Sequence, residues 1–240
     1  MRRCTTTRRM VRLALLVSAI VALSLSFGVT PAAADFSVNP PSGSWNGYTI
    51  YLSRACHDGN DGIPGGPCIP NSGCNGYNEN SQSVATTWDA AAITYYGQGG
   101  LRNRGYKTIV GTGTASQNIA NSNAAGVNLH VPVHSNAQGD GSPCGGSSSS
   151  GNNGTHMLYV SSSGNTCGQK LVSTLGPSSP GTNDRPVYRS NLGELNSTNA
   201  VACYVEVEFH TWVTGRNWLI AEEAYAWRIG YGIDVYFGYP

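Results

Sequence analysis

The sequence has few charged side chains. Of its 240 residues 14 are Lys or Arg and 13 are Asp or Glu, fewer together than the 31 glycines. The first 34 residues hold five of the arginines and no acidic residue, so the remaining chain has nine basic against 13 acidic side chains, a formal charge of −4. A chain without a basic excess is not expected to bind nucleic acid or an anionic membrane surface. Its many Gly, Ser and Asn residues fit an exported protein with long polar loops.

Paired Cys-x-x-Cys spacings are also absent, which argues against a cysteine-rich zinc site. Six cysteines follow residue 34, namely Cys56, Cys68, Cys74, Cys144, Cys167 and Cys203. An even number of cysteines in an exported chain is most simply explained by disulfides. Their connectivity cannot be deduced from the sequence, but proximity favours Cys68–Cys74 and Cys144–Cys167, which leaves Cys56–Cys203.

Residues 1–34 are predicted to be a signal peptide that is removed on export. An arginine-rich start precedes the apolar run 13–29, and Ala32-Ala33-Ala34 forms a small-residue cleavage site. A membrane-spanning helix is the alternative, but no charged stop-transfer flank follows. The pair Arg8-Arg9 loosely resembles a twin-arginine signal, so the export route stays open. We expect a secreted mature chain, residues 35–240, that forms one domain and has no membrane association.

The mature chain alternates between strand and helix patterns. Strands are expected at 48–55, 106–112, 127–136, 156–161 and 202–209. Helices are expected from residue 80, at 116–125, at 166–175 and around 220–231, and loops at 137–155 and 177–195. This order predicts an α/β fold: a single three-layer αβα domain with a mostly parallel central sheet and helices on both faces.

Three candidate metal ligands stand at the edges of these elements. His134 lies where the apolar strand 127–136 runs into small polar residues, and open α/β sheets bind ligands at the carboxyl ends of their strands. His57 follows the first strand, and Glu79 immediately precedes the first helix. A catalytic zinc takes about three such ligands and leaves one position for water.

Glu206 and Glu208 lie within the apolar strand 202–209. Glutamates there are costly unless they are paired or used. The two-residue period of a strand predicts that both share a face with His210. One of them could be a general base beside a metal site. A structural salt bridge, for instance with Arg185 or Arg189, is the alternative.

Four motifs in order resemble the zinc-dependent N-acetylmuramoyl-L-alanine amidases of amidase family 3. The motifs are Ala55-Cys56-His57-Asp58-Gly59, Asn78-Glu79-Asn80, Val133-His134-Ser135-Asn136 and Val205-Glu206-Val207-Glu208-Phe209. The resemblance spans about residues 48–237. It implies that His57, Glu79 and His134 bind Zn²⁺ and that Glu206 is the catalytic carboxylate. Glu208 stands where the family usually has glycine, so the choice between the two glutamates stays open.

The resemblance implies a secreted peptidoglycan hydrolase of the cell wall. Such an enzyme cleaves the amide between N-acetylmuramic acid and the L-alanine of the stem peptide, with zinc-activated water and a glutamate general base. Asn136, Glu208 and His210, and less strongly His156, are expected to line the cleft, and His130 is expected to have a structural role. Two alternatives stay open: a zinc peptidase acting on stem peptides, and a non-catalytic wall-binding protein with a degenerate site.

Overall fold

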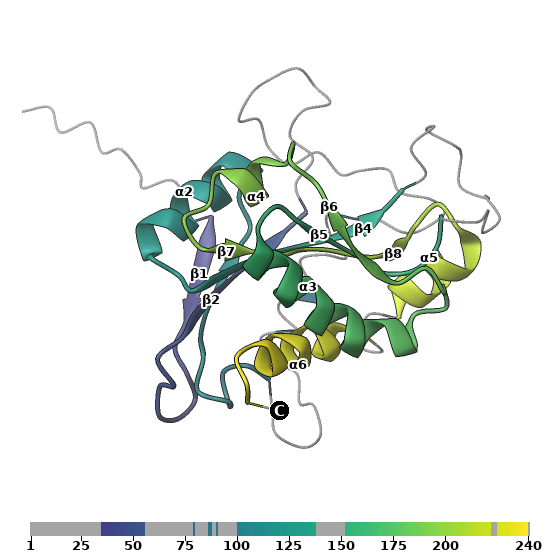
Figure 1. Cartoon of the computed structure of the whole chain (residues 1–240). Coiled ribbons are helices and arrows are strands. Elements are labelled where there is room, and N and C mark those ends of the chain that lie inside the picture. The colour runs from purple at the N-terminus through teal and green to yellow at the C-terminus, as the bar shows by residue number, and fades with distance from the viewer. Residues whose placement is uncertain are drawn as a thin grey trace, which may run out of the picture. The chain divides into compact units, whose positions relative to one another are not determined.

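A central β-sheet organises the computed structural model, which describes residues 35–55, 79, 86–87, 90, 100–137, 152–221 and 225–239. The strands are β1 (Phe36–Asn39), β2 (Thr49–Arg54), β3 (Lys107–Gly111), β4 (Leu129–Asn136), β5 (His156–Tyr159), β6 (Arg185–Tyr188), β7 (Val201–Ala202) and β8 (Tyr204–Phe209). Their order in the sheet is β1-β3-β2-β4-β8-β5-β6, and β7 also pairs with β4 (Figure 1). The sheet is mixed: β1 runs antiparallel to β3 and β5 antiparallel to β8, whereas the other five pairings are parallel.

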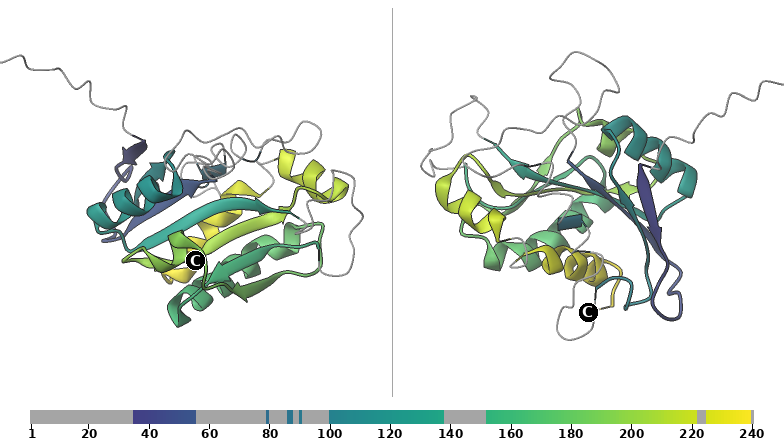
Figure 2. Two further views of the ribbon diagram at one scale, coloured as in Figure 1. Left: turned by 90° about the horizontal axis from the view of Figure 1, so that it is seen from above. Right: turned by 180° about the vertical axis from the view of Figure 1, so that it is seen from behind.

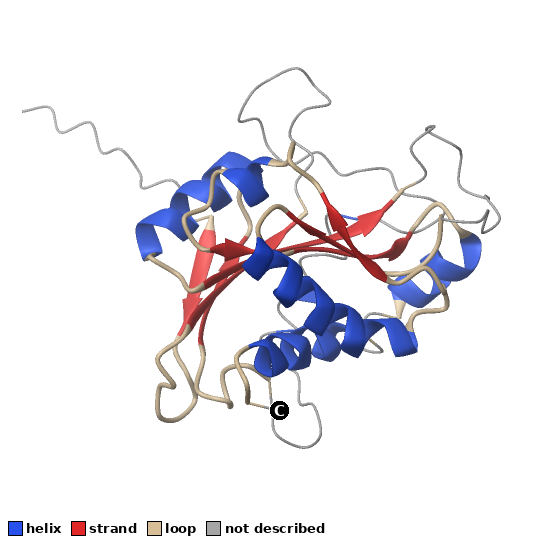
Figure 3. Ribbon diagram, in the orientation of Figure 1, coloured by secondary structure: helices blue, strands red, loops and turns tan. Residues whose placement is uncertain are grey.

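Helices lie on both faces of this sheet (Figures 2 and 3). They are α2 (Ala115–Ala125), α3 (Ser162–Leu175), α4 (Gly193–Asn196), α5 (Val213–Ile220) and α6 (Ala226–Tyr236), with a 3₁₀ turn at Gly176–Ser178. Helix α2 begins with a capping box between Thr114 and Gln117 and ends at Gly126 in the left-handed conformation. None of the helices in the described part of the chain combines the length and the apolar character that crossing a bilayer needs.

The two faces of β4 differ in chemistry. Val131 and Val133 point into the main core, where they join Leu171 of α3 and Ile229 of α6. The alternating residues of the strand, among them His134, therefore project from the other face. A smaller apolar cluster covers part of that second face, and it includes Leu158, Leu195, Ala202 and Tyr204. The strand alternation thus turns the polar residues of β4 away from the main core.

All five predicted strands are present, and β1, β6 and α4 are among the elements that were not predicted. Strand β1 pairs at one edge of the sheet, and β6 and α4 lie in the segment 177–195 that was expected to be a loop. Each of these has only four residues, too few to show a period, and β6 contains Pro186, which is tolerated in an edge strand. The prediction of a single helix around 220–231 was wrong, because two helices occur there: α5 ends at Ile220 and α6 starts at Ala226.

Within the part of the chain that the structure describes, a disulfide joins Cys167 of α3 to Cys203, which lies between β7 and β8. The two Cα atoms are 6.1 Å apart, and both residues are fully buried. This bond overturns the predicted pairs Cys144–Cys167 and Cys56–Cys203. Proximity in the sequence misled the prediction, because α3 packs across the sheet face and meets a strand 36 residues further along the chain. The predicted pair Cys68–Cys74 lies outside the described residues.

Candidate active site

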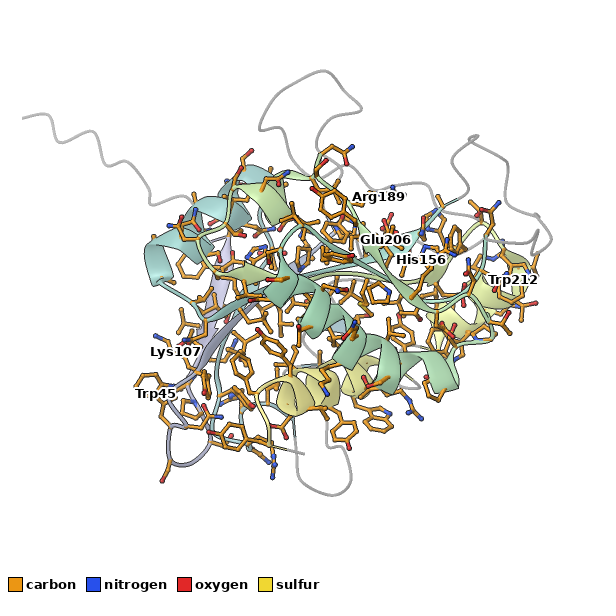
Figure 4. All side chains as sticks on the ribbon, viewed as in Figure 1. Trp45, Lys107, His156, Arg189, Glu206 and Trp212 are labelled. Atoms are coloured by element: carbon orange, nitrogen blue, oxygen red, sulfur yellow. A yellow bond between two sulfur atoms is a disulfide. The ribbon has the colours of Figure 1, made fainter. Side chains whose placement is uncertain are left out.

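His134 and Glu206 lie side by side in the sheet. They are register partners on the parallel strands β4 and β8, so their side chains project from the same face. His156 of β5 is the register partner of Glu206 on its other side. Figure 4 shows Glu206, His156 and Arg189 near one another at the end of these strands. Three neighbouring strands thus each bring one ionisable side chain to a common face.

Glu79, a helical residue outside the sheet, also has its side chain at this face. Its Oε1 atom lies 3.2 Å from Nδ1 of His134 and accepts a hydrogen bond of 3.0 Å from the backbone N–H of Ser135. The exposed fractions of Glu79 and His134 are only 2% and 8%. Burying a carboxylate without hydrogen-bond partners costs free energy, and here the backbone N–H of Ser135 at the end of β4 is such a partner. The structure therefore brings two of the three predicted metal ligands together.

The chemistry of Glu79 and His134 fits a zinc ion. Carboxylate oxygen and imidazole nitrogen are both ligands of Zn²⁺, and a tetrahedral ion with bonds of about 2.0–2.1 Å holds its ligand atoms about 3.3 Å apart. The observed 3.2 Å between Oε1 and Nδ1 matches that spacing. His57, the third predicted ligand, lies outside the described residues. Within the described residues alone, no group of three His, Cys, Asp or Glu side chains could hold a metal ion.

Glu206 is partly exposed, and its pKa is raised to about 7. Burial is the main cause and the nearby carboxylate of Glu79 adds to it, whereas the positive charge of Arg189 lowers the pKa. Among the described residues Glu206 forms no ion pair, so the alternative of a structural salt bridge finds no support there. The guanidinium of Arg185 instead donates to Oδ1 of Asn183 at 2.7 Å. Glu206 therefore remains available for proton transfer.

Glu208 occupies a different environment. Its side chain is fully buried and accepts hydrogen bonds from the backbone N–H groups of Gly154 (2.7 Å), Gly181 (3.1 Å) and Phe209 (2.9 Å) and from the hydroxyl of Ser179. Burial raises its pKa, and these hydrogen bonds act in the opposite direction. The carboxylate of Glu208 thus hydrogen-bonds the loop that contains Gly154 and the loop that contains Ser179 and Gly181 to the end of β8.

A register shift explains why the two glutamates differ. β4 and β8 are paired at His134 and Glu206 and again at Asn136 and Phe209, so β8 has one extra residue between these pairs. The bulge breaks the two-residue period that predicted a common face for Glu206, Glu208 and His210. Phe209, not Glu208, follows Glu206 on the face of His134 and Asn136.

Asn136 and His156 contact each other beside Glu206. The amide Nδ2 of Asn136 lies 3.3 Å from Nδ1 of His156, and the ring of His156 packs edge-to-face on Phe209 with centroids 5.3 Å apart. The pKa of His156 is lowered to about 4, mainly by burial and also by the charges of Arg185 and Arg189, whereas a hydrogen bond with the backbone of Asn183 raises it. His156 is therefore neutral at pH 7, and its Nδ1 can accept the amide hydrogen of Asn136.

The other two histidines bond to their own surroundings. Nδ1 of His210 lies 2.8 Å from the hydroxyl of Ser135, and its ring is mostly buried. His130 is fully buried, stacks on Tyr51 with ring centroids 5.1 Å apart, and contacts Oε1 of Glu194 at 3.0 Å through Nε2. The structural role expected for His130 is confirmed.

Tyr204 is a site residue that the sequence analysis missed. Its ring stacks on His134 with centroids 4.6 Å apart and planes 29° from parallel. This stacking contact restricts the orientation of the imidazole. The two-residue period could have found it, since Tyr204 precedes Glu206 by two positions on the same face.

Solved structures of amidases share this arrangement of elements. AmiC2 of Nostoc punctiforme, an N-acetylmuramoyl-L-alanine amidase, has a TM-score of 0.63 at 17% identity, with 81% of this chain and 99% of that chain covered. The catalytic domain of CwlV from Bacillus (Paenibacillus) polymyxa var. colistinus gives 0.60 at 15% identity over 80% and 99% of the two chains. Ami1 from Mycobacterium smegmatis gives 0.59 at 18% identity over 82% and 100%.

The chain has the amidase fold. No protein-family model and no curated protein matches its sequence. The likeness to the amidases thus rests on the arrangement of the elements, and at 15–18% identity it concerns the fold alone. Within the amidase fold of this chain, the pair of Glu79 and His134 and the carboxylate of Glu206 share the carboxyl end of the central strands.

Proposed function

We propose that this chain is a secreted, zinc-dependent N-acetylmuramoyl-L-alanine amidase that acts on the peptidoglycan of the bacterial cell wall. The observation that carries the proposal is the position of Glu206, a carboxylate without an ion-pair partner among the described residues, in register with His134 on a fold shared with amidases. The motif resemblance supports this reaction, and the fold shared with amidases is compatible with it.

His57, Glu79 and His134 would hold the zinc ion. Bound there, Zn²⁺ would supply Lewis-acid chemistry, lowering the pKa of water to near 7 and polarising the scissile carbonyl. Ser135 orients the carboxylate of Glu79 through its backbone N–H, and Tyr204 holds the ring of His134 by stacking. Such contacts around metal ligands fix their orientation, and they are already in place in this chain.

Glu206 would act as the general base and then as the general acid. Its carboxylate takes a proton from the attacking water and delivers it to the nitrogen of the leaving L-alanine. A group works best in this role when its pKa lies near the working pH, and the pKa of Glu206 is about 7. The neutral ring of His156 and the amide of Asn136 would line the adjoining surface, where they can bond to the substrate without competing for the proton.

The test is to incubate the purified mature protein with isolated peptidoglycan, with and without a chelator. New amino termini are then quantified, and the residue that carries them is identified. Newly exposed N-terminal L-alanine that disappears with chelator and returns with Zn²⁺ is the expected result. New termini on other residues would indicate a peptidase of stem peptides. Peptidoglycan bound without any new terminus would indicate a wall-binding protein.

A further inference from the structure

A pocket lies at the opposite end of the sheet from Glu206. Its volume is about 580 Å³, and its walls include Trp45, Thr49, Lys107, Gly126 and Asn128. That volume falls within the range of small-molecule sites, about 300–1,000 Å³. Figure 4 shows Trp45 and Lys107 close together and well removed from the labelled residues of the candidate active site. Six strand positions separate Asn128 from His134, a distance of about 20 Å along extended chain. The pocket is therefore distinct from the candidate active site.

Trp45 presents a fixed aromatic surface to this pocket. Its side chain is 61% exposed, the highest value among the large apolar residues of the described chain. The indole Nε1–H donates a hydrogen bond of 3.0 Å to the backbone oxygen of Tyr48, which sets the orientation of the ring. An exposed ring that is already oriented loses little conformational freedom when a ligand stacks on it.

The loop that carries Trp45 is anchored to the rest of the domain. The backbone N–H of Ser42 donates to the oxygen of Arg102, and that of Asn46 donates to the oxygen of Gly105, both at 2.9 Å. Gly105 has a φ of +90°, and a Cβ atom there would lie 2.7 Å from the oxygen of Ser44. Glycine at this position permits the close approach, so the wall formed by this loop exists before any ligand arrives.

The polar groups of the pocket include both donors and acceptors. Oδ1 of Asn128 accepts from the backbone N–H of Thr49 at 2.7 Å, which leaves the amide NH₂ as a donor. The ammonium group of Lys107 forms no ion pair among the described residues. Helix α2 ends at Ala125 against the pocket, and the last carbonyl groups of a helix lack partners within it. Hydroxyl and acetamido groups of a sugar could bond to this combination.

We propose that the pocket binds a glycan strand whose amino sugars carry free lactyl carboxylates. The apolar face of a pyranose ring would stack on Trp45, its hydroxyl and acetamido groups would bond to Asn128 and the end of α2, and the carboxylate would pair with Lys107. Outside the predicted signal peptide the chain has a formal charge of −4, so a single unpaired lysine in a pocket favours a ligand with isolated negative charges over a polyphosphate.

The choice of ligand rests on the proposed function. Hydrolysis of the amide consumes one water, places an amine on L-alanine and leaves a carboxylate on the lactyl group of the glycan. The ligand of this pocket would thus be the glycan product of the reaction. The pocket and the candidate active site lie at opposite ends of the central β-strands. A glycan chain freed of its stem peptides could therefore stay bound in the pocket while a new segment of peptidoglycan is hydrolysed at the candidate active site.

The test measures calorimetric binding of two soluble oligosaccharides to the purified mature protein. One is peptidoglycan glycan freed of its stem peptides, and the other is a chitin oligosaccharide of equal length, which lacks the lactyl carboxylates. We expect the lactyl-bearing glycan to bind more tightly. Trp45→Ala should weaken its binding about fivefold or more, as expected for loss of an aromatic contact. Lys107→Met should remove the preference over chitin.

Two more variants keep the result interpretable if Trp45→Ala folds poorly. Ala125→Glu places a negative charge at the exposed end of α2 and should weaken binding of the lactyl-bearing glycan. Ile220→Ala removes an apolar side chain, 48% exposed, on α5 and should bind like the wild type. Absence of binding by the wild type, equal affinity for chitin, or unchanged binding in both Trp45→Ala and Ala125→Glu would overturn the proposal.

Failure of this proposal is distinguishable from failure of the proposed function. Binding needs no catalysis, so Glu206→Gln should bind the glycan as the wild type does. Conversely, Trp45→Ala should release the stem peptide, with L-alanine as its new amino terminus, from a short soluble muramyl peptide at the wild-type rate but digest intact peptidoglycan more slowly. Glycan binding without release of N-terminal alanine would support the pocket and refute the amidase.

Discussion

His134 and Glu206 are register partners on adjacent parallel strands, and the raised pKa of Glu206 reflects how little of its environment is water. The bulge that follows directly separates Glu206 from Glu208, two residues further along the same strand. One glutamate faces the candidate metal ligands, whereas the other is enclosed by loop N–H groups. This difference allows the roles of the two glutamates to be tested separately.

Glu206→Gln should abolish activity and leave the fold intact. Loss of a general base typically costs about 10²–10⁴ in rate, whereas a partly exposed side chain outside special contacts changes stability by less than about 1 kcal/mol. The measurements are the appearance of new N-terminal L-alanine in peptidoglycan and urea unfolding at pH 7. Activity within tenfold of wild type would remove Glu206 from the role of base.

Glu208→Gln should show the opposite pattern. Its carboxylate accepts hydrogen bonds from Gly154, Gly181, Ser179 and Phe209, and the amide NH₂ of glutamine would face some of these donors. We expect a loss of about 2–4 kcal/mol in the free energy of unfolding. Activity per folded molecule should fall far less than in Glu206→Gln. A stable but inactive Glu208→Gln would move the catalytic role to Glu208.

His134→Ala and Glu79→Gln should both lose bound zinc as well as activity. The two side chains lie 3.2 Å apart and fit neighbouring positions around one ion. Metal content of the purified variants, measured by atomic emission, checks the expectation against His210→Gln. His210 bonds to Ser135 and is not a proposed ligand, so this control should retain zinc. A full complement of zinc in His134→Ala would refute the proposed ligand set.

His156 should make the fold sensitive to acid. Its pKa is about 4 in the folded protein against an ordinary value of 6.5, so the unfolded chain takes up a proton at higher pH than the folded one. The stabilisation is complete above pH 6.5 and is lost as the pH falls through about 4. The difference in pKa corresponds to at most about 3 kcal/mol.

His156→Gln checks this pH dependence. The side chain of glutamine can still accept from the amide of Asn136 but does not titrate. The free energy of unfolding of wild type and variant is compared at several pH values between 7 and 4. The stability of the wild type should fall relative to that of the variant across this window. Parallel pH profiles for both proteins would show that His156 is not the cause.

The sequence predicted those parts of the fold in which a local pattern decides the structure. Strands β2, β3, β4 and β8 are apolar on the face that covers the main core, and α2 has a capping box and a glycine stop, so each appeared near its predicted bounds. The split between α5 and α6 was not visible, because the supposed period counted Ile220, whose side chain is 48% exposed. The predicted helix from residue 80 is represented by Glu79, Thr86, Thr87 and Ala90, which are helical.

The candidate site depended on relations that a single sequence does not contain. Motif order gave Glu79, His134 and Glu206 as candidates, but it left the choice between Glu206 and Glu208 open. That distinction comes from a bulge whose extra residue is defined only by the neighbouring strand. The same holds for the disulfide, since only the packing of α3 on the sheet brings Cys167 to Cys203.

Removing the disulfide should lower stability without removing the fold. It closes a loop over a sequence separation of 36 residues, which corresponds to about 3–4 kcal/mol of chain entropy in the unfolded state. The variant is Cys167→Ala with Cys203→Ala, which leaves every other cysteine of the chain unchanged. Both side chains are fully buried in the main core, so part of the loss comes from the two sulfur atoms.

Cys167→Ala with Cys203 retained serves as the control, since it breaks the same bond but keeps one sulfur. Urea unfolding should show nearly equal losses for both proteins, because loss of the cross-link dominates. A midpoint like that of the wild type in both would show that Cys167 and Cys203 are not joined in solution.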